Sequence, residues 1–243
     1  MKHYGLIGRS LKHSFSQSFF TGYFAAKSIE GKYHLIEIES LDELADTLSG
    51  KYEGINVTIP YKEEIIPFLD SLTEEAKAIG AVNVVEFLDG KKIGHNTDAF
   101  GFHQSIKPFL TNRHERALIF GTGGASKAVE FVLKSLGLDV IFISRTPQKE
   151  NHFGYDEVND LMIDACKLIV NTTPVGTFPD IDASIDLPFQ ALTEEHLVID
   201  LIYNPAKTKF LEKSENAGAT ILNGETMLKQ QALKSWEIWS KDV

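Results

Sequence analysis

The segment that most constrains the fold spans residues 116–137 and reads RALIFGTGGASKAVEFVLKSLG. It describes an apolar strand, a glycine turn and an amphipathic helix. Gly121 and Gly123 fit the first two positions of the G-x-G-x-x-G/A pattern, and Ser126 stands at the third. The first glycine makes a tight turn, the second lets a pyrophosphate approach the backbone, and the helix N-terminus offers N–H groups to phosphate. The segment therefore predicts a dinucleotide-binding unit; the alternative is a turn that serves packing alone.

The region around this turn alternates strand and helix. The predicted strands are rich in Ile, Val and Leu without polar alternation, as expected for a parallel sheet buried on both faces; they cover residues 117–120, 140–144, 168–171, 198–202 and 220–222. Gly137 is a natural stop for the helix of the glycine turn. The buried face of that helix is expected to hold Val129, Val132, Leu133 and Leu136.

The first hundred residues also mix strands with helices. Apolar runs predict strands over residues 4–8, 33–38, 55–59 and 81–87. Helices are predicted over residues 19–26 and 63–69, after a capping Thr73, and along the face marked by Leu41, Leu44 and Leu48. Asp89-Gly90 is a hairpin signal, so at least one strand pair is antiparallel.

A domain boundary is predicted within residues 96–101, because a new helix begins there and the pattern then restarts. The predicted fold class is α/β with two domains. Residues 1–99 and 224–243 would form an N-terminal domain with a mostly parallel sheet, and residues 100–223 the dinucleotide-binding domain. The helical pattern over residues 225–239 is expected to pack back on the first domain.

Composition excludes several classes of protein. The 243 residues carry a formal net charge of −10, which argues against a nucleic-acid partner. Cys166 is the only cysteine, so no intrachain disulfide forms, and the eight histidines show no metal-ligand spacing. No apolar run is long enough for a signal peptide or a membrane span. We expect a soluble cytoplasmic protein without a metal.

A second group of polar residues is found in the run GINVTIPYK, residues 54–62, and in three further segments of the chain. Asn56 and Thr58 alternate with apolar neighbours on a strand, Pro60 ends the strand, and Lys62 follows. HSFS, GAVN and NTD add hydroxyls, amides and a carboxylate at residues 13–16, 80–83 and 96–98. Each segment alone is typical of a cap or turn. Together they suit a small polyhydroxylated molecule.

The strand end at residue 144 indicates which dinucleotide binds. NAD-binding domains normally place an acidic residue there for the ribose hydroxyls. This chain instead has SRTPQK, so Ser144, Arg145, Thr146 and Lys149 would surround a 2′-phosphate. We therefore predict NADP rather than NAD, the alternative being an Arg145 that is merely solvated.

Nine motifs, taken in order, resemble the shikimate dehydrogenase family: HSFSQS, GINVTIPYK, GAVN, GHNTDAFG, GTGGASKA, SRT, NTTPVG, DLIYNPAKT and GETMLKQQA. The resemblance runs from Gly8 to Ala232. It implies a substrate domain, a Rossmann-like NADP-binding domain, and reversible NADPH-dependent reduction of 3-dehydroshikimate to shikimate in chorismate and aromatic amino-acid biosynthesis. The sequence departs from the family pattern at Ser10, Ser144 and Thr177, where proline, asparagine and methionine are usual.

The resemblance also implies site residues. Lys62 and Asp98 would be the catalytic pair. The implied substrate contacts are Ser14, Ser16, Asn56, Thr58, Lys62, Asn83, Asp98, Tyr203 and Gln231. The implied cofactor contacts are Glu74, Gly121, Thr122, Gly123, Gly124, Ala125, Ser144, Arg145, Thr146, Lys149, Leu201 and Gly224. The partner would be the small-molecule substrate, and the protein a monomer or homodimer.

Three alternatives stay open at this point. One is a quinate/shikimate dehydrogenase that uses NAD. Another is a regulatory nucleotide-binding module, which would be expected to lack Lys62 or Asp98. The third is a reductase with a nucleophilic cysteine, although Cys166 precedes an apparent buried strand and is better interpreted as a core residue.

Overall fold

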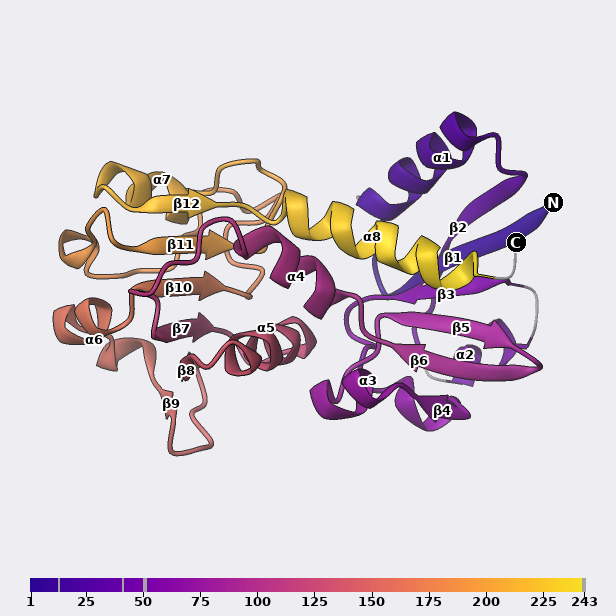
Figure 1. Cartoon of the computed structure of the whole chain (residues 1–243), viewed down its shortest axis with the longest axis horizontal. Helices are drawn as coiled ribbons and strands as arrows, with labels where there is room; N and C mark the ends of the chain where they lie inside the picture. Colours follow the sequence, from indigo (N-terminus) through magenta and orange to yellow (C-terminus); the bar gives the residue numbers. More distant parts are fainter. Residues whose placement is uncertain (13, 41, 50–51, 242–243) are drawn as a thin grey trace. The chain divides into compact units, whose positions relative to one another are not determined.

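The computed structural model describes residues 1–12, 14–40, 42–49 and 52–241, so His13 of the HSFS motif and Leu41 lie outside the described residues. The chain divides into two compact units. Unit 1 comprises Met1–Gly101 and Gln230–Val243, and unit 2 comprises Phe102–Lys229. Each unit contains one six-stranded sheet (Figure 1). The α/β fold class is confirmed.

Unit 1 has the sheet order β2-β1-β3-β5-β6-β4. Three strand pairs are parallel and two, β3–β5 and β5–β6, are antiparallel. The predicted hairpin is present, and both Asp89 and Gly90 have positive φ. The strands are β1 (Lys2–Gly8), β2 (Gly31–Glu37), β3 (Gly54–Val57), β4 (Ser71–Leu72), β5 (Val84–Leu88) and β6 (Lys91–His95); the helices are α1 (Phe15–Lys27), α2 (Asp42–Thr47), the 3₁₀ turn η1 (Ile66–Phe68) and α3 (Glu74–Ile79).

Helices cover both faces of this sheet because its residues alternate in direction. Tyr4 of β1 faces α1 and the end of α8 (Glu225–Trp239), where it packs with Phe20 and Trp239. Ile7 of the same strand faces the opposite cluster, which includes Leu44 of α2. The Trp239 indole N–H donates to the Val85 carbonyl oxygen at 3.1 Å. The predicted packing of the C-terminal helix on the first domain is therefore confirmed.

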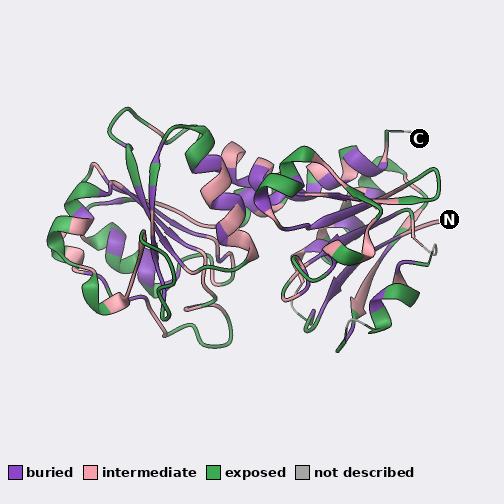
Figure 2. Cartoon of the chain, turned by 90° about the horizontal axis from the view of Figure 1, so that it is seen from below, coloured by how far each residue is buried: buried purple, intermediate pink, exposed green. Residues whose placement is uncertain are grey.

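Unit 2 has an all-parallel sheet in the order β12-β11-β10-β7-β8-β9. Leu118 of β7 packs with α6 and α7 through Ile163 and Phe210, whereas α5 contacts β7 and β8. The strands are therefore buried between helices, as Figure 2 shows. Its elements are β7 (Arg116–Phe120), α5 (Gly124–Ser135), β8 (Asp139–Ile143), β9 (His152–Phe153), η2 (Tyr155–Glu157), α6 (Asp160–Ala165), β10 (Leu168–Asn171), η3 (Phe189–Ala191), β11 (Leu197–Asp200), α7 (Lys209–Asn216) and β12 (Thr220–Leu222), and α4 (Asp98–Ile106) enters it from unit 1.

The structure corrects three local predictions. The helix predicted over residues 63–69 is a series of turns that ends in η1, because Pro67 has no N–H and disfavours a helical residue before it. Leu136 is 40% exposed because the helix ends at Ser135. The alternation of strand and helix is incomplete: β9 is an extra strand, and only η3 lies between β10 and β11.

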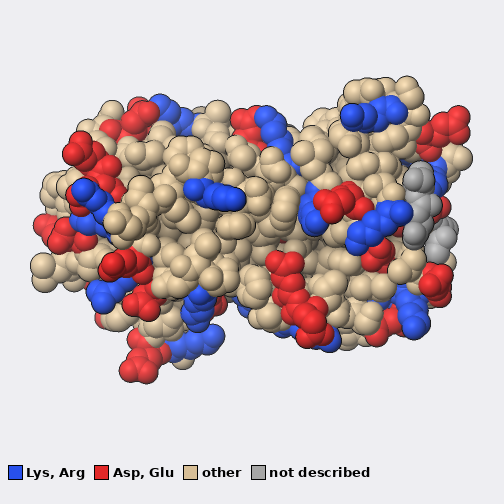
Figure 3. Space-filling model, in the orientation of Figure 1, with Lys and Arg blue, Asp and Glu red and all other residues tan. Residues whose placement is uncertain are grey.

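Charged side chains of both signs are interspersed on the face of the protein that Figure 3 displays.

Tyr4 gives a stability prediction for unit 1. Its side chain is fully buried, its hydroxyl has no hydrogen-bond partner among the described residues, and burial raises the pKa of Tyr4 to about 12. A buried hydroxyl without a partner costs about 1–3 kcal/mol. Tyr4→Phe should therefore raise the free energy of unfolding, by about 1 kcal/mol, in urea denaturation. A decrease would contradict the hydroxyl being unpaired.

Candidate active site

Lys62 and Asp98 form an ion pair inside unit 1. Lys62 Nζ donates to Asp98 Oδ2 at 2.6 Å, and the two side chains are 14% and 8% exposed. Lys62 follows the cis Ile59–Pro60 bond, and its carbonyl oxygen accepts the Val82 N–H at 2.7 Å. Asp98 is the first residue of α4. The fold thus brings an ammonium and a carboxylate together where little water screens their interaction.

Asn83 orients the other oxygen of Asp98. Asn83 Nδ2 donates to Asp98 Oδ1 at 2.9 Å and to Thr97 Oγ1 at 3.0 Å, and Asn83 Oδ1 accepts the Thr97 N–H at 2.7 Å. Gln231 Oε1 lies 3.5 Å from Asn83 Nδ2. Both carboxylate oxygens of Asp98 therefore have protein donors. An ammonium has three donors, and Asp98 uses one of those on Lys62.

Asn56 belongs to the same buried network. Its Oδ1 accepts the Tyr33 hydroxyl at 2.7 Å, and its Nδ2 donates to Ser235 Oγ at 3.0 Å and to the Asn83 carbonyl oxygen at 3.3 Å. Tyr33, Thr97 and Ser235 were not predicted from the sequence. Ser235 carried a usable signal, because it stands four residues after Gln231 and therefore on the same helix face.

The remaining predicted substrate contacts in unit 1 are Ser14, Ser16 and Thr58. Ser16 is a buried residue of α1 that lowers the pKa of Tyr33, against the larger effect of burial. Ser14 is the N-cap residue of α1, but its side chain makes no capping hydrogen bond. Thr58 is half-buried beside Gly8, where an added Cβ would come within 2.7 Å of Thr58 Cγ2.

The glycine turn of unit 2 has the geometry that a dinucleotide requires. Gly121 has φ +100°, and a Cβ there would lie 2.8 Å from Thr172 Oγ1, so only glycine fits. A Cβ on Gly123 would meet no protein atom within 4 Å, and Gly123 is the N-cap of α5. Ser126 fills the third pattern position as a buried residue whose hydroxyl donates to the Gly123 carbonyl oxygen at 2.6 Å. The predicted phosphate residues Thr122, Gly124 and Ala125 lie in this turn and the first turn of α5.

The residues predicted to bind a 2′-phosphate follow β8 on the surface of unit 2. Arg145, Thr146 and Lys149 are exposed. Ser144 is buried and its Oγ accepts the Thr146 N–H at 3.2 Å, so it shapes the loop from inside. No carboxylate of the described chain forms an ion pair with Arg145 or Lys149, and both positive charges are available to a phosphate.

The other predicted cofactor contacts occupy different elements. Gly224 is buried against Leu201, and a Cβ on Gly224 would overlap the Leu201 carbonyl oxygen. Tyr203, which was predicted as a substrate contact, follows β11 in the same loop as Leu201 and is half-buried. Glu74 is the first residue of α3 in unit 1, where it is exposed and pairs with Lys77 at 2.6 Å. The structure brings Leu201 and Gly224 together within unit 2.

A buried carboxylate that the sequence analysis did not select lies beside this loop. Asp200 is fully buried at the end of β11, and it accepts hydrogen bonds from Asn171 Nδ2 at 3.0 Å, the Ile202 N–H at 3.1 Å and Thr208 Oγ1 at 2.7 Å. Burial raises the pKa of Asp200 to about 6, although the three hydrogen bonds oppose that rise. Asp200 thus joins the loop after β11 to the end of β10.

Asp200 predicts a pH dependence of stability. Its folded-state pKa of about 6 lies above the ordinary value of 3.8, so the folded state binds the proton more tightly. Its contribution to stability is therefore largest at low pH and falls as the pH rises from 4 to about 6, by about 3 kcal/mol at full effect. Urea denaturation of wild type and Asp200→Asn at several pH values measures this. The stability of wild type relative to the variant should be greater at pH 4 than at pH 7, and an equal difference at both would contradict the raised pKa.

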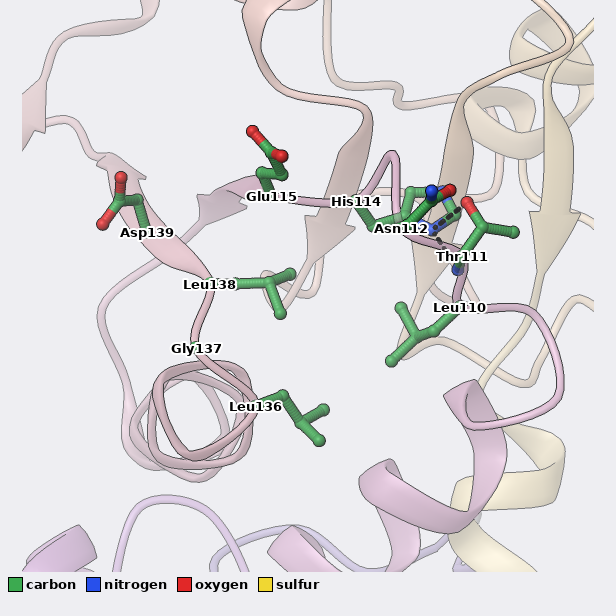
Figure 4. Close-up of a pocket in the computed structure, with 9 residues that line it drawn as sticks. All are labelled: Leu110, Thr111, Asn112, His114, Glu115, Leu136, Gly137, Leu138 and Asp139. Carbon is green, nitrogen blue, oxygen red and sulfur yellow. Dashed lines mark hydrogen bonds between the residues drawn. The ribbon is translucent and has the colours of Figure 1, made fainter.

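Unit 2 also contains a cavity of about 650 Å³ that the dinucleotide would not use. It lies between the segment that includes Thr111 and His114 and the segment that includes Leu136 and Leu138 (Figure 4). These residues stand at the amino ends of β7 and β8, whereas the glycine turn follows the carboxyl end of β7. Ligands of open α/β sheets bind at the carboxyl ends of the strands.

Cys166 is a core residue, as predicted. It is fully buried, and burial raises the pKa of its thiol to about 11, which disfavours a reactive thiolate. Among the described residues, no group of three or more His, Cys, Asp or Glu side chains could hold a metal ion. In the same part of the chain, no helix has both the length and the apolar character needed to cross a membrane.

The fold and these two groups of residues define an α/β oxidoreductase that uses a nicotinamide dinucleotide. Residues 6–85 match the family model described as the shikimate dehydrogenase substrate binding domain. A relative from Aquifex aeolicus (strain VF5), named shikimate dehydrogenase (NADP(+)), is 39% identical over 248 residues, which cover 98% of this chain and 90% of that protein. The chain belongs to the shikimate dehydrogenase family.

Solved structures agree with this membership. The shikimate 5-dehydrogenase of Thermus thermophilus, in complex with NADP(H) and shikimate, has a TM-score of 0.87 and 31% identity, and the match covers 99% of this chain and 94% of that one. The quinate dehydrogenase of Corynebacterium glutamicum, in complex with NAD, also has a TM-score of 0.87, with 26% identity and coverage of 98% and 93%. The fold is therefore shared by members named for different substrates and cofactors.

Proposed function

We propose that this protein is an NADP-dependent shikimate dehydrogenase that reversibly reduces 3-dehydroshikimate to shikimate, a step in chorismate and aromatic amino-acid biosynthesis. The observation that carries the proposal is the buried Lys62–Asp98 pair, set among the amides of Asn56, Asn83 and Gln231. This arrangement offers a proton, a carboxylate and neutral hydrogen-bonding groups to a molecule with several hydroxyls and one ketone. The family membership supports the same substrate.

Unit 1 is the proposed substrate domain. The Lys62 ammonium donates a proton to the ketone oxygen during reduction and stabilises the negative charge that develops there. Asp98 holds the ammonium in place and accepts a hydrogen bond from a substrate hydroxyl. Ser14 and Ser16 are assigned to the substrate carboxylate as hydroxyl donors, and Thr58 is assigned as a further substrate contact.

Unit 2 is the proposed NADP-binding domain. The glycine turn would hold the pyrophosphate, because Gly121 allows the tight turn, the space beside Gly123 is open and the α5 N-terminus favours an anion. Arg145 and Lys149 would bind the 2′-phosphate. Leu201, Tyr203 and Gly224 are assigned to the nicotinamide end and its substrate neighbour. When bound, NADPH supplies the hydride.

The test is to follow NADPH or NADH formation with shikimate or quinate and with NADP⁺ or NAD⁺. The highest kcat/KM is expected for shikimate with NADP⁺. No turnover with any of the four pairs would contradict an oxidoreductase of this family. A higher kcat/KM for quinate with NAD⁺ would favour the quinate/shikimate dehydrogenase that uses NAD. Cytoplasmic location and a monomeric or homodimeric state stay predictions.

A further inference from the structure

The Tyr33 side chain is buried in unit 1 next to the substrate network. Tyr33 lies on β2, and its ring stacks on Phe20 with centroids 4.6 Å apart and an interplanar angle of 12°. Its hydroxyl donates to Asn56 Oδ1 at 2.7 Å. Burial strongly raises the pKa of Tyr33, and a hydrogen bond from Ser16 opposes this only in part. The hydroxyl therefore keeps its proton, and the hydrogen-bond geometry directs that proton to Asn56 Oδ1.

That donor fixes which way the Asn56 amide points. With Oδ1 facing Tyr33, Nδ2 faces Ser235 Oγ at 3.0 Å and the Asn83 carbonyl oxygen at 3.3 Å, and every contact pairs a donor with an acceptor. The flipped amide would place its oxygen against the Asn83 carbonyl oxygen. Without the Tyr33 hydroxyl, Asn56 Oδ1 loses its donor, and only the two contacts of Nδ2 remain to hold the amide in place.

The fixed amide connects to the reacting pair through Asn83. The Asn83 carbonyl oxygen accepts from Asn56 Nδ2 and from the Val57 N–H at 2.9 Å, which anchors the Asn83 backbone. The Asn83 side chain in turn donates to Asp98 Oδ1, and Asp98 Oδ2 accepts from Lys62. A chain of hydrogen bonds therefore runs from the Tyr33 hydroxyl to the Lys62 ammonium.

We propose that Tyr33 is a positioning residue for this reaction, which acts by holding the Asn56 amide and, through Asn83, the Lys62–Asp98 pair in the orientation that the substrate requires. The proposal rests on the proposed function, because it concerns the site for the hydroxylated substrate. Tyr33 need not touch the substrate.

The test is Tyr33→Phe, which keeps the ring that stacks on Phe20 and removes only the hydroxyl. kcat/KM for shikimate is expected to fall about tenfold, as for loss of one buried hydrogen bond to an oriented amide, while KM for NADP⁺ is unchanged. Tyr33→Phe should cost little in an Asn56→Ala background, because the two residues act as one unit. The turnover of the wild-type protein with shikimate and NADP⁺ is measured before any variant. If the wild-type protein shows no turnover, the proposed function is contradicted, and not the role of Tyr33.

Tyr61→Phe is the matched control. Tyr61 is also buried in unit 1, and its hydroxyl donates to the Ile38 carbonyl oxygen at 2.6 Å rather than to a side chain of the network. The Tyr61→Phe variant should lower the melting temperature about as much as Tyr33→Phe does, and its kcat/KM for shikimate should stay near the wild-type value. Three results would overturn the proposal: unchanged kcat/KM in Tyr33→Phe, effects of Tyr33→Phe and Asn56→Ala that simply add, or loss of NADP⁺ binding together with shikimate turnover, which would indicate a general structural role.

Discussion

Lys62→Ala is expected to lower kcat for shikimate oxidation by about 10²–10⁴-fold, the usual contribution of a general acid or base. The variant removes the only ammonium paired with Asp98 in the described network and leaves the amides of Asn83 and Gln231 in place. KM for shikimate should therefore change much less than kcat. Steady-state kinetics with saturating NADP⁺ separates the two constants.

Lys92→Ala is a suitable control for removal of a paired lysine. Lys92 belongs to unit 1 and pairs with Asp70 at 3.2 Å on the surface, with side chains 29% and 45% exposed. It should retain wild-type kcat, because surface ion pairs contribute about 0–1 kcal/mol and Lys92 touches no group of the site. Near wild-type kcat in Lys62→Ala would refute the proton-transfer role.

Arg145→Ala should lower kcat/KM for NADP⁺ by about 10–100-fold, because one charge-assisted hydrogen bond to a phosphate is worth about 1.5–3 kcal/mol. kcat/KM for NAD⁺ should hardly change, since NAD⁺ has no 2′-phosphate. Adding Lys149→Ala should reduce NADP⁺ use further and leave NAD⁺ use unchanged. The ratio of the two kcat/KM values is thus the measurement that isolates the 2′-phosphate contact.

Arg113→Ala provides the matched arginine control in unit 2. Arg113 pairs with Glu195, and it lines a cavity near the amino ends of the strands, away from the glycine turn. Arg113→Ala should leave the ratio of kcat/KM for NADP⁺ to kcat/KM for NAD⁺ as in wild type. If Arg145→Ala affects NADP⁺ and NAD⁺ equally, Arg145 contacts a group common to both dinucleotides and the predicted preference has another source.

Local sequence patterns predicted most of the fold. The bounds predicted for β10, β12 and α8 agree with the structure, because an uninterrupted apolar run and a helical periodicity are both signals carried by neighbouring residues. The helix predicted over residues 63–69 was wrong because Pro67 outweighed the helix formers around it. The short strand β9 has only two residues, too few for a periodic pattern.

The buried network could be predicted only in part. Lys62, Asn83 and Asp98 stood in polar motifs at strand ends, where ligand-binding residues gather. Tyr33 and Ser235 did not: Tyr33 reads as an ordinary strand residue, and the one signal for Ser235 is its place four residues after Gln231 on the same helix face. They reach Asn56 across 23 and 179 residues of sequence, and only the packing of α8 and the order of the sheet create those contacts.

Unit 1 is built from two chain segments, so its polar network is completed only after the second segment has been synthesised. Ribosomes release residues 230–241 after the whole of unit 2, so Gln231 and Ser235 are the last polar groups to join the network. A nascent chain can complete its nucleotide unit well before its substrate pocket is finished. A chain truncated just before residue 230 is therefore expected to bind the dinucleotide and to lack catalytic activity.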